Sequence, residues 1–311
     1  MLLLKEKNML RQIKRIVTEP KYIFIYALYI FAKFIPDRLY LKLLFRLKMG
    51  YWMDFDNPQT FNEKLQWLKL YNRRPEYTQM VDKYAAKEYV ASIIGAEYII
   101  PTLGVWDSVE DIDFDSLPNQ FVLKCTHDSG GIVICTDKSQ LNIEEAKSKL
   151  KKGLKRDYYP TSREWPYKNV PHRIIAEQYM VDESGYELKD YKFFCFDGVP
   201  KALFIASDRG NTTEETKFDF FDMDFHHLPF TNGHSNAVKP VLKPKGFEMM
   251  KILAAKLSQG MPHARIDFYN INGQIYFGEI TFFHWGGIVP FDPEEWDYTF
   301  GSWITLPEKQ K

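Results

Sequence analysis

The chain has 311 residues, 45% of them hydrophobic and 26% charged, which is the composition of an ordinary globular protein of about two domains. The formal net charge is zero, so composition gives no support to a nucleic-acid partner. The three cysteines, Cys125, Cys135 and Cys195, are an odd number that implies no disulfide framework and fits a reducing, cytoplasmic compartment.

Residues 1–50 form a basic, aromatic-rich segment for which we predict helices. The segment contains eleven lysines and arginines against three acidic residues, and its run over 22–32 is apolar. That run is shorter than the roughly 20 apolar residues of a membrane-spanning helix, and no small-residue cleavage site indicates a signal peptide. Two interpretations are open: the segment rests on the inner face of an anionic membrane, or it packs on the protein body as a helical prefix.

Two helices are predicted next. Thr60, with Glu63 three residues later, has the capping-box pattern and predicts a helix that begins at the following residue. A second helix is expected over Thr78–Ile94, where a glycine ends it. Lys83 and Lys87 lie four residues apart in this second helix and would therefore share one face.

Lys124 lies near the end of a strand predicted over 121–125, ahead of a loop that contains Ser129, Gly130 and Gly131. Glycines let backbone N–H groups approach phosphate oxygens, and a lysine supplies a compact positive charge. The spacing is not that of a Walker A loop, because no Gly-Lys-Ser/Thr follows. An ordinary hairpin turn is the alternative.

Residues 173–180 form a predicted strand that ends in the step Glu177, Gln178, Tyr179 and Met180. A polar step after an apolar strand can present backbone groups to the edge of an adenine ring at the seam between two lobes.

The strand predicted over 189–196 places opposite charges on one face. Asp190 and Lys192 alternate along it, and they offer an acceptor for ribose hydroxyls and a donor for phosphate. A turn at Asp197 and Gly198 leads into the next strand.

A hairpin predicted over 264–283 carries the most informative chemistry. Arg265 and Asp267 alternate on its first strand, and Glu279 and Thr281 alternate on the second, beyond an Asn-Gly turn. The hairpin therefore brings two carboxylates together beside a cation. Such a pair is costly unless a metal lies between the carboxylates, and their hard oxygens suit Mg²⁺ bound to nucleotide phosphates. A surface hairpin with solvated charges is the alternative.

In chain order these motifs resemble the ATP-grasp superfamily, and more closely the TupA-like ATP-grasp family, which is associated with teichuronopeptide and surface-polysaccharide biosynthesis. The resemblance covers most of the chain beyond residue 50. It is carried by Phe55-Asp-Asn-Pro-Gln-Thr-Phe-Asn-Glu-Lys-Leu-Gln-Trp67, residues 121–131, Lys189-Asp-Tyr-Lys-Phe-Phe-Cys-Phe196 and residues 291–303.

Strands and helices alternate without a regular βαβ rhythm, which favours an α+β class with antiparallel sheets. The resemblance implies the ATP-grasp fold, in which two α+β lobes with antiparallel sheets grip ATP, here preceded by a helical N-terminal segment. The expected divisions are residues 1–50, an N-terminal helical region over 51–115, a small lobe with a glycine-rich flap over 116–180, and a large lobe with the metal site over 181–311.

The resemblance also implies roles for individual residues. The nucleotide would be bound by Lys83 and Lys124 at its phosphates, Ser129, Gly130 and Gly131 as a flap, Glu177 and Gln178 at the adenine edge, Tyr179 and Met180 in the hinge, Asp190 at the ribose, and Lys192 beside it. Asp267 and Glu279 would bind Mg²⁺, and Arg265, with Lys124, would stabilise charge in the reaction. Thr281 stands where the ligase pattern commonly has asparagine, and its hydroxyl could still ligate the metal directly or through water.

The implied activity is that of an ATP- and Mg²⁺-dependent carboxylate–amine ligase with an acyl-phosphate intermediate, acting in cell-surface polysaccharide or glycopeptide biosynthesis. Its acceptor would be a uronic acid, an amino acid or a lipid-linked sugar. The enzyme would be cytoplasmic, and residues 1–50 would hold it at the inner membrane face if the first interpretation of that segment is right.

Two other classes of function remain open. A nucleotide-sugar-dependent glycosyltransferase would use an Asp-x-Asp motif, for which Asp222-Met-Asp224 is the best candidate. A non-catalytic scaffold is the third class, although Lys124, Asp267 and Glu279 are all present. The stretch His284-Trp-Gly-Gly287 after the metal strand either shapes an acceptor pocket or is a simple turn.

Overall fold

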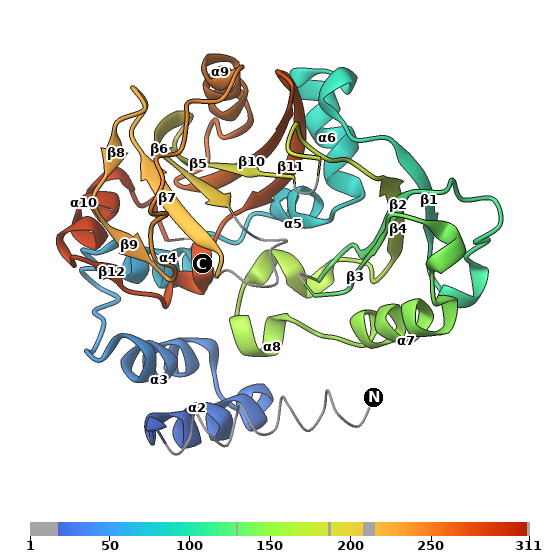
Figure 1. Cartoon of the computed structure of the whole chain (residues 1–311). Coiled ribbons are helices and arrows are strands. Elements are labelled where there is room, and N and C mark those ends of the chain that lie inside the picture. The colour runs from blue at the N-terminus through green and yellow to red at the C-terminus, as the bar shows by residue number, and fades with distance from the viewer. Residues whose placement is uncertain (1–17, 129, 186–187, 208–214, 310–311) are drawn as a thin grey trace.

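The computed structural model describes residues 18–128, 130–185, 188–207 and 215–309, and within them two antiparallel sheets are surrounded by helices (Figure 1). The smaller sheet has the strand order β1-β4-β2-β3. Its strands are β1 (Thr102–Trp106), β2 (Phe121–Cys125), β3 (Ile132–Cys135) and β4 (Ile174–Gln178). Helix α7 (Ile143–Leu154) packs on this sheet through Ala146 and Leu150, which are buried with the apolar side chains of β2, β3 and β4.

The larger sheet has the strand order β11-β10-β5-β6-β7-β8. Its strands are β5 (Asp190–Phe196), β6 (Val199–Ser207), β7 (Lys217–Phe221), β8 (His227–Leu228), β10 (Ala264–Ile271) and β11 (Gln274–Thr281). A short separate pair joins β9 (Thr231–Asn232) to β12 (Phe291–Asp292). All pairings described in these sheets are antiparallel, so the expected α+β class with antiparallel sheets is confirmed.

Strand β5 is buried along its whole length because helices cover both faces of the larger sheet. On one face Phe193 packs against Phe247 of α9 (Phe247–Leu257). On the other face Phe194 packs against Phe61 and Phe300. The polar residues at the start of β5 lie on this second face, because side chains alternate along a strand.

The second face of the sheet is covered by helices α4 (Phe61–Tyr71) and α10 (Glu295–Trp303). The predicted capping box is confirmed: the Thr60 side chain accepts from the Glu63 backbone, and the Glu63 carboxylate accepts from the Thr60 backbone. This pairing satisfies backbone N–H groups that the first helical turn leaves without partners. The two helices touch so closely that Gly301 of α10 lies directly against the backbone at the start of α4.

The single helix predicted over Thr78–Ile94 is wrong, because the structure has two helices there. Helix α5 (Glu76–Val81) ends before Asp82, and α6 (Ala85–Ile94) begins after it. The Asp82 side chain accepts from the backbone of Tyr84 at 2.9 Å and forms an ion pair with Arg173 at 2.8 Å. A tertiary ion pair and a local side-chain cap thus outweigh the helical periodicity of this stretch.

The N-terminal helices α2 (Lys21–Ile30) and α3 (Asp37–Met49) form a pair that lies below the two sheets in Figure 1. Arg163 ties them to the body: it donates to the carbonyl oxygen of Ile35 at 3.0 Å and pairs with Asp37 at 3.1 Å. Tyr40 donates to the carbonyl oxygen of Thr161, in the short helix α8 (Tyr159–Ser162), at 2.8 Å. The pair is therefore packed on the protein body through its inner side.

We predict that Gly301→Ala destabilises the protein, because a Cβ there would lie 2.3 Å from the Gln59 carbonyl oxygen. Overpacking against backbone should lower the free energy of unfolding by about 2 kcal/mol, more than the helix propensity of alanine restores. Ser302→Ala, on the exposed side of the same helix, should change it by less than about 0.5 kcal/mol. Urea denaturation of both variants tests this, and equal stabilities would contradict the tight contact between α4 and α10.

Candidate active site

The charged residues of the β10–β11 hairpin lie opposite one another as the sequence predicts. Arg265 pairs with Thr281 and Asp267 pairs with Glu279 in the antiparallel ladder. The two turn residues, at positions 272 and 273, both have positive φ, which is the geometry of a two-residue hairpin of the Asn-Gly type. The turn sets this register, and the register places all four side chains on one face.

Arg265 is the centre of this group, and its guanidinium is buried. It donates to Asp267 Oδ1 at 2.7 Å, to Glu279 Oε1 at 3.1 Å and to Thr281 Oγ1 at 3.0 Å. A buried guanidinium is stable only when its donors find such partners. The hydroxyl of Thr281 therefore serves Arg265 in this structure.

His284 accepts a further hydrogen bond from Arg265. Its Nδ1 lies 2.9 Å from Arg265 Nη1, and its Nε2 lies 2.9 Å from Asn232 Oδ1. Arginine can only donate, so Nδ1 must be the acceptor and Nε2 carries the proton. Burial, together with the nearby Arg265 charge, holds the pKa of His284 well below its usual range and keeps the ring neutral. His284 thus orients the guanidinium from behind.

Lys192 brings a second cation to the same carboxylates from the neighbouring strand β5. Its ammonium group donates to Asp267 and lies 3.3 Å from Asp190 Oδ1 and 3.9 Å from Glu279 Oε1. Asp267 is fully buried and accepts from both Arg265 and Lys192. Asp190 and Lys192 lie on one face of β5, as their alternation in the sequence predicts.

Glu279 is the more accessible carboxylate of the pair, with a side chain 40% exposed against 1% for Asp267. Desolvation raises its pKa, but the charges of Lys192, Arg265 and Lys83 outweigh that effect and lower the pKa of Glu279 to about 2. The group is therefore ionised at neutral pH. Two carboxylates on adjacent strands, one of them open to solvent, are a donor set that fits Mg²⁺, whose other positions would be taken by water or phosphate oxygens.

On the smaller sheet, a carboxylate lies between two lysines. Glu177 Oε1 lies 2.6 Å from Lys87 Nζ, and its Oε2 lies 2.5 Å from Lys124 Nζ. Burial raises the pKa of Glu177, but the charges of the two lysines lower it by more, so the net shift is downward. Burial lowers the pKa of Lys87. Both oxygens of Glu177 are occupied by lysines in this structure.

The loop after β2 is held by hydrogen bonds from two cationic side chains. Lys83 donates to the carbonyl oxygen of Asp128 at 2.8 Å, and the Asp128 carboxylate accepts from Arg156 at 2.7 and 2.9 Å. Gly131 approaches Cys125 so closely that an added Cβ would lie 2.7 Å from its sulfur. Only glycine fits this close approach, which positions the loop over the sheet. Ser129 lies outside the described residues.

A cleft of about 200 Å³ between the two sheets collects many of the predicted nucleotide residues. The predicted residues that line it are Lys83, Lys124, Gly131, Glu177, Asp190, Lys192 and Glu279. Of the other described residues with a predicted nucleotide contact, Gly130, Gln178, Tyr179 and Met180 are not in its lining. Apolar walls come from Ile100, Ile132 and Phe277. The cleft thus combines charged groups with apolar side chains suited to a flat ring.

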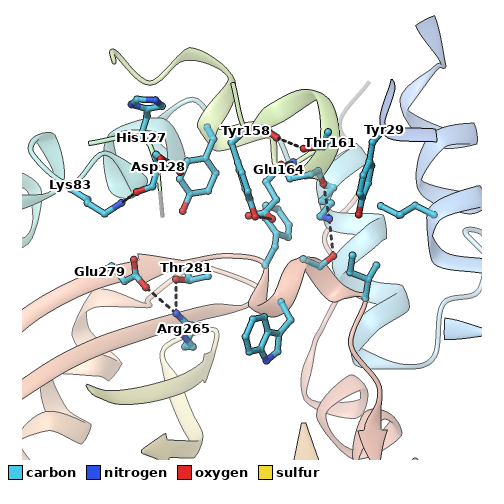
Figure 2. A pocket seen from close by; sticks show the side chains of 18 residues that line it. Tyr29, Lys83, His127, Asp128, Tyr158, Thr161, Glu164, Arg265, Glu279 and Thr281 are labelled. Atoms are coloured by element: carbon cyan, nitrogen blue, oxygen red, sulfur yellow. Dashed lines mark hydrogen bonds and ion pairs between the residues drawn. The ribbon is translucent and has the colours of Figure 1, made fainter. Parts of the chain in front are cut away.

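A second cavity, of about 480 Å³, adjoins the cleft and shares Lys83, Asp128 and Glu279 with it. Figure 2 shows Arg265 and Glu279 on its lower side and the residues of helix α8 and the preceding loop on its upper side. We call it the acceptor cavity. It extends from the charged hairpin to the N-terminal helices and is large enough for a sugar or amino-acid unit.

Within the acceptor cavity a buried carboxyl group faces a buried lysine. Glu164 accepts from Tyr158 Oη at 3.1 Å, and Lys69 donates to the carbonyl oxygens of Ser162 and Gly286 at 2.9 and 2.8 Å. Burial raises the pKa of Glu164 against the opposing charge of Lys69, and burial lowers the pKa of Lys69. The cavity therefore contains two buried ionisable groups whose pKa values shift toward each other.

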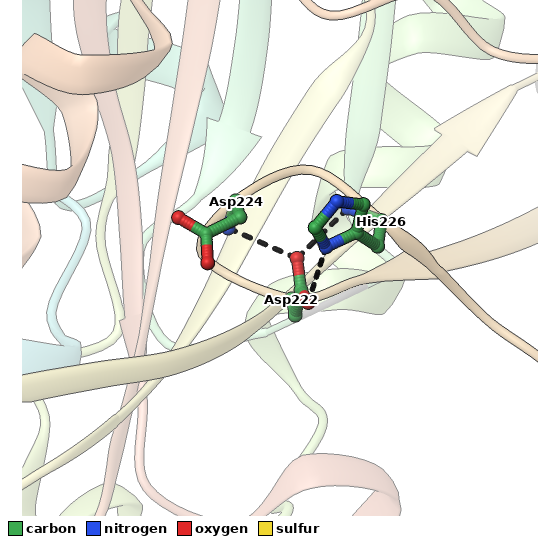
Figure 3. A group of neighbouring side chains, drawn as sticks. All are labelled: Asp222, Asp224 and His226. Carbon is green, nitrogen blue, oxygen red and sulfur yellow. Dashed lines mark hydrogen bonds and ion pairs between the residues drawn. The ribbon is translucent and has the colours of Figure 1, made fainter.

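The Asp-x-Asp candidate lies outside both cavities and stabilises a turn (Figure 3). Asp222 Oδ1 accepts from the backbone of Asp224 at 2.9 Å and of His226 at 2.8 Å, and its Oδ2 lies 3.0 Å from His226 Nδ1. These side chains could hold a metal ion, but they lie at the surface, and local hydrogen bonds occupy the Asp222 carboxylate.

The sequence analysis assigned no site role to several of these groups. Lys87 and Asp128 lie within stretches that it singled out but received no role, whereas Lys69 and Glu164 gave no signal of their own. The contacts of Lys87 with Glu177, of Asp128 with Arg156 and of Lys69 with Ser162 join residues more than twenty positions apart, which no local period reveals.

Similarity to known proteins is found with a family model and with solved structures. A family model described as TupA-like ATPgrasp matches residues 63–305, and no curated protein matches the sequence. Among solved structures, the chain is similar to D-alanine–D-alanine ligase from Helicobacter pylori (TM-score 0.43, 13% identity, covering 78% of this chain and 69% of that one). It is also similar to the Bacillus anthracis D-alanine–D-alanine ligase complexed with ATP (TM-score 0.38, 15% identity, 65% and 53%).

A third similar structure is the ATP-grasp ligase PsnB, complexed with minimal precursor, Mg and ADP (TM-score 0.39, 9% identity, 71% and 57%). The chain thus spans 69% of the Helicobacter pylori ligase, 53% of the Bacillus anthracis ligase and 57% of PsnB. At this distance the solved structures do not assign an activity to the chain.

We predict that Glu177 stabilises the fold only while it is ionised. Because its folded-state pKa is lowered, its contribution is present above the unfolded-state pKa of about 4.3 and is lost as the pH falls. Glu177→Gln leaves two lysines uncompensated and should lower the free energy of unfolding by about 3 kcal/mol at pH 7. The difference from wild type should shrink below about pH 4. Urea denaturation across this range tests it, and a pH-independent difference would contradict the ion-pair assignment.

Proposed function

The chain belongs to the TupA-like ATP-grasp family, and on that premise we propose that it is an ATP- and Mg²⁺-dependent carboxylate–amine ligase. The observation that carries the proposal is the junction of the two cavities at Lys83, Asp128 and Glu279. One cavity would hold the nucleotide and the other the acceptor, so the γ-phosphate and the acceptor carboxylate would meet at Glu279 and Arg265. Positioning of this kind is the main source of catalysis in phosphoryl transfer.

The charge of the cleft supports a divalent cation. Four lysines line the cleft, and four carboxylates balance them: Lys83, Lys87, Lys124 and Lys192 against Asp128, Glu177, Asp190 and Glu279. A balanced cleft offers little net attraction to a bare polyanionic triphosphate. When bound at Asp267 and Glu279, Mg²⁺ would neutralise phosphate charge and orient the transferred group.

The residues of the chain would act as follows in this reaction. Lys83 and Lys124 would contact phosphate oxygens, and Asp190 would accept from the ribose. Arg265, fixed by Asp267 and His284, would stabilise the charge that develops as the acceptor carboxylate attacks the γ-phosphate to form an acyl phosphate. An amine would then displace the phosphate and form the amide, without a covalent bond to the protein.

For the acceptor we propose a uronic acid, an amino acid or a lipid-linked sugar from cell-surface polysaccharide or glycopeptide biosynthesis. The size of the acceptor cavity and its mixture of aromatic, hydroxyl and charged groups support this range. Trp285, 40% exposed at the cavity, offers a flat apolar surface of the kind on which a sugar ring can lie. We favour the ligase over the glycosyltransferase alternative, because Asp222 and Asp224 lie outside both cavities and Asp222 is engaged in a surface turn.

We expect Lys124→Ala to weaken ATP binding about tenfold or more, because it removes a charged donor from the cleft. Glu177 keeps Lys87 as its partner in this variant, so the fold should persist. Lys152→Ala, at an exposed position of α7, is the matched control and should bind ATP as the wild type does. Calorimetric titration with ATP measures both. Unchanged affinity in Lys124→Ala would refute the phosphate contact.

The metal site is tested by Asp267→Asn combined with Glu279→Gln. We expect this variant to lose the dependence of ATP binding on Mg²⁺ and to lower ADP formation by at least about a hundredfold, because the carboxylates that would hold the ion are gone. Asp222→Asn combined with Asp224→Asn removes two carboxylates at the surface cluster and should change neither quantity. Calorimetry with and without Mg²⁺, repeated with UDP-sugars, separates the two sites. Binding of UDP-sugars but not ATP would favour a glycosyltransferase.

A further inference from the structure

The N-terminal helix pair presents an apolar surface that the described part of the chain does not cover. The side chains on it are strongly exposed: Ile23 by 52%, Phe24 by 64%, Ile30 by 73%, Phe31 by 57% and Phe34 by 83%. They come from α2, from its C-cap residue Phe31 and from the 3₁₀ turn that follows, η1 (Ala32–Phe34). We call these five residues the N-terminal patch. A contiguous patch of large apolar side chains usually marks an interaction site.

This surface is not the packing face of the helix. The inner face of α2 carries Tyr22, Ile25 and Leu28, which are buried against Leu41 and Leu44 of α3. Helix α2 is therefore apolar on two sides, and a helix of that kind is stable in water only if something covers its second side.

The charges around the N-terminal patch identify its partner as anionic. The described lysines and arginines of this unit are Lys21, Lys33, Arg38, Lys42, Arg46 and Lys48. Its acidic residues are engaged within the protein: Glu19 pairs with Lys21 at 3.0 Å, and Asp37 pairs with Arg73 at 2.7 Å. The six basic side chains therefore exceed the two acidic ones, and the surplus positive charge favours an anionic surface.

The dimensions of α2 fit a position along a bilayer and not across it. Its ten residues span about 15 Å, half of a hydrocarbon core of about 30 Å. Among the described residues, no helix is long and apolar enough to cross a membrane. A short helix with aromatic side chains on its outer face and lysines beside them is typical of attachment at the lipid headgroup level.

The same helices form the far wall of the acceptor cavity. Tyr29 of α2 and Leu44 of α3 line it, and Figure 2 shows Tyr29 directed toward the part of the cavity that contains Thr161 and Glu164. The N-terminal patch lies on the outside of this wall. A surface beneath the patch would therefore lie close to the cavity.

We propose that residues 18–50 dock the protein on an anionic lipid bilayer through the N-terminal patch. The apolar side chains enter the headgroup region, and the lysines and arginines contact anionic headgroups. This docking does not depend on the ligase activity. If both proposals hold, the acceptor cavity faces the surface from which a lipid-linked substrate would enter.

Co-sedimentation of the full-length protein with vesicles tests the proposal. The protein should sediment with vesicles of mixed phosphatidylcholine and phosphatidylglycerol, less with phosphatidylcholine alone, and less at high salt. Phe24→Ser, Phe31→Ser and Phe34→Ser combined should lower the affinity at least about tenfold. The matched control is Val238→Ser with Leu242→Ser, two side chains that are 98% and 83% exposed outside the patch. The control should bind like the wild type.

Absence of sedimentation by the wild type, or equal sedimentation of the phenylalanine variant, would overturn the proposal. So would a concentration-dependent dimer that the variant disperses, since a second copy of the chain would then cover the patch. Thermal unfolding and ATP titration of the variant without vesicles check its fold and separate this outcome from failure of the ligase proposal. If the variant does not fold, Lys21→Gln with Lys33→Gln takes its place and should lose the preference for anionic vesicles.

Discussion

The guanidinium of Arg265 is a permanent positive charge in the interior of the molecule, and its surroundings are arranged to compensate it. Two carboxylates, a hydroxyl and a neutral imidazole receive its hydrogen bonds. Two of these groups are fixed in turn: Asp267 by Lys192 of β5, and His284 by Asn232 of β9. Removing any one would leave a buried charge or donor unsatisfied, which is costly. The network therefore joins strands β5, β10 and β11 of the larger sheet to the separate strand β9 around the candidate reaction centre.

The charged side chains in the cleft between the sheets are also compensated by protein partners. Every lysine that lines it has a protein oxygen as its partner. Lys87 and Lys124 contact Glu177, and Lys83 contacts the carbonyl oxygen of Asp128. Lys192 contacts Asp190 of β5 and Asp267 of β10. These contacts keep long, flexible side chains in place before a nucleotide arrives, which lowers the entropic cost of binding it. A phosphate oxygen would then replace a protein oxygen as the partner of a lysine that is already ordered.

The acceptor cavity joins this charged centre to the N-terminal helices. Its middle section holds Glu164 and Lys69, both buried, and its outer wall is formed by α2 and α3. Because Arg163 and Tyr40 fix those helices to the stretch that carries Glu164, the wall and the buried carboxyl group belong to one rigid arrangement. The acceptor cavity thus lies between the proposed reaction centre and the helices of the proposed membrane surface.

What the sequence alone determined was local. The capping box at Thr60 and the alternation of Arg265 with Asp267 and of Glu279 with Thr281 across an Asn-Gly turn are set by neighbours a few residues apart, and the structure confirms them. The family resemblance extended this to the fold. Only the tertiary structure decided that α5 and α6 separate at Asp82, that Glu177 lies between two lysines, and that Glu164 faces Lys69. These contacts join segments far apart in the chain, and they form because folding buries charges that must then find a partner.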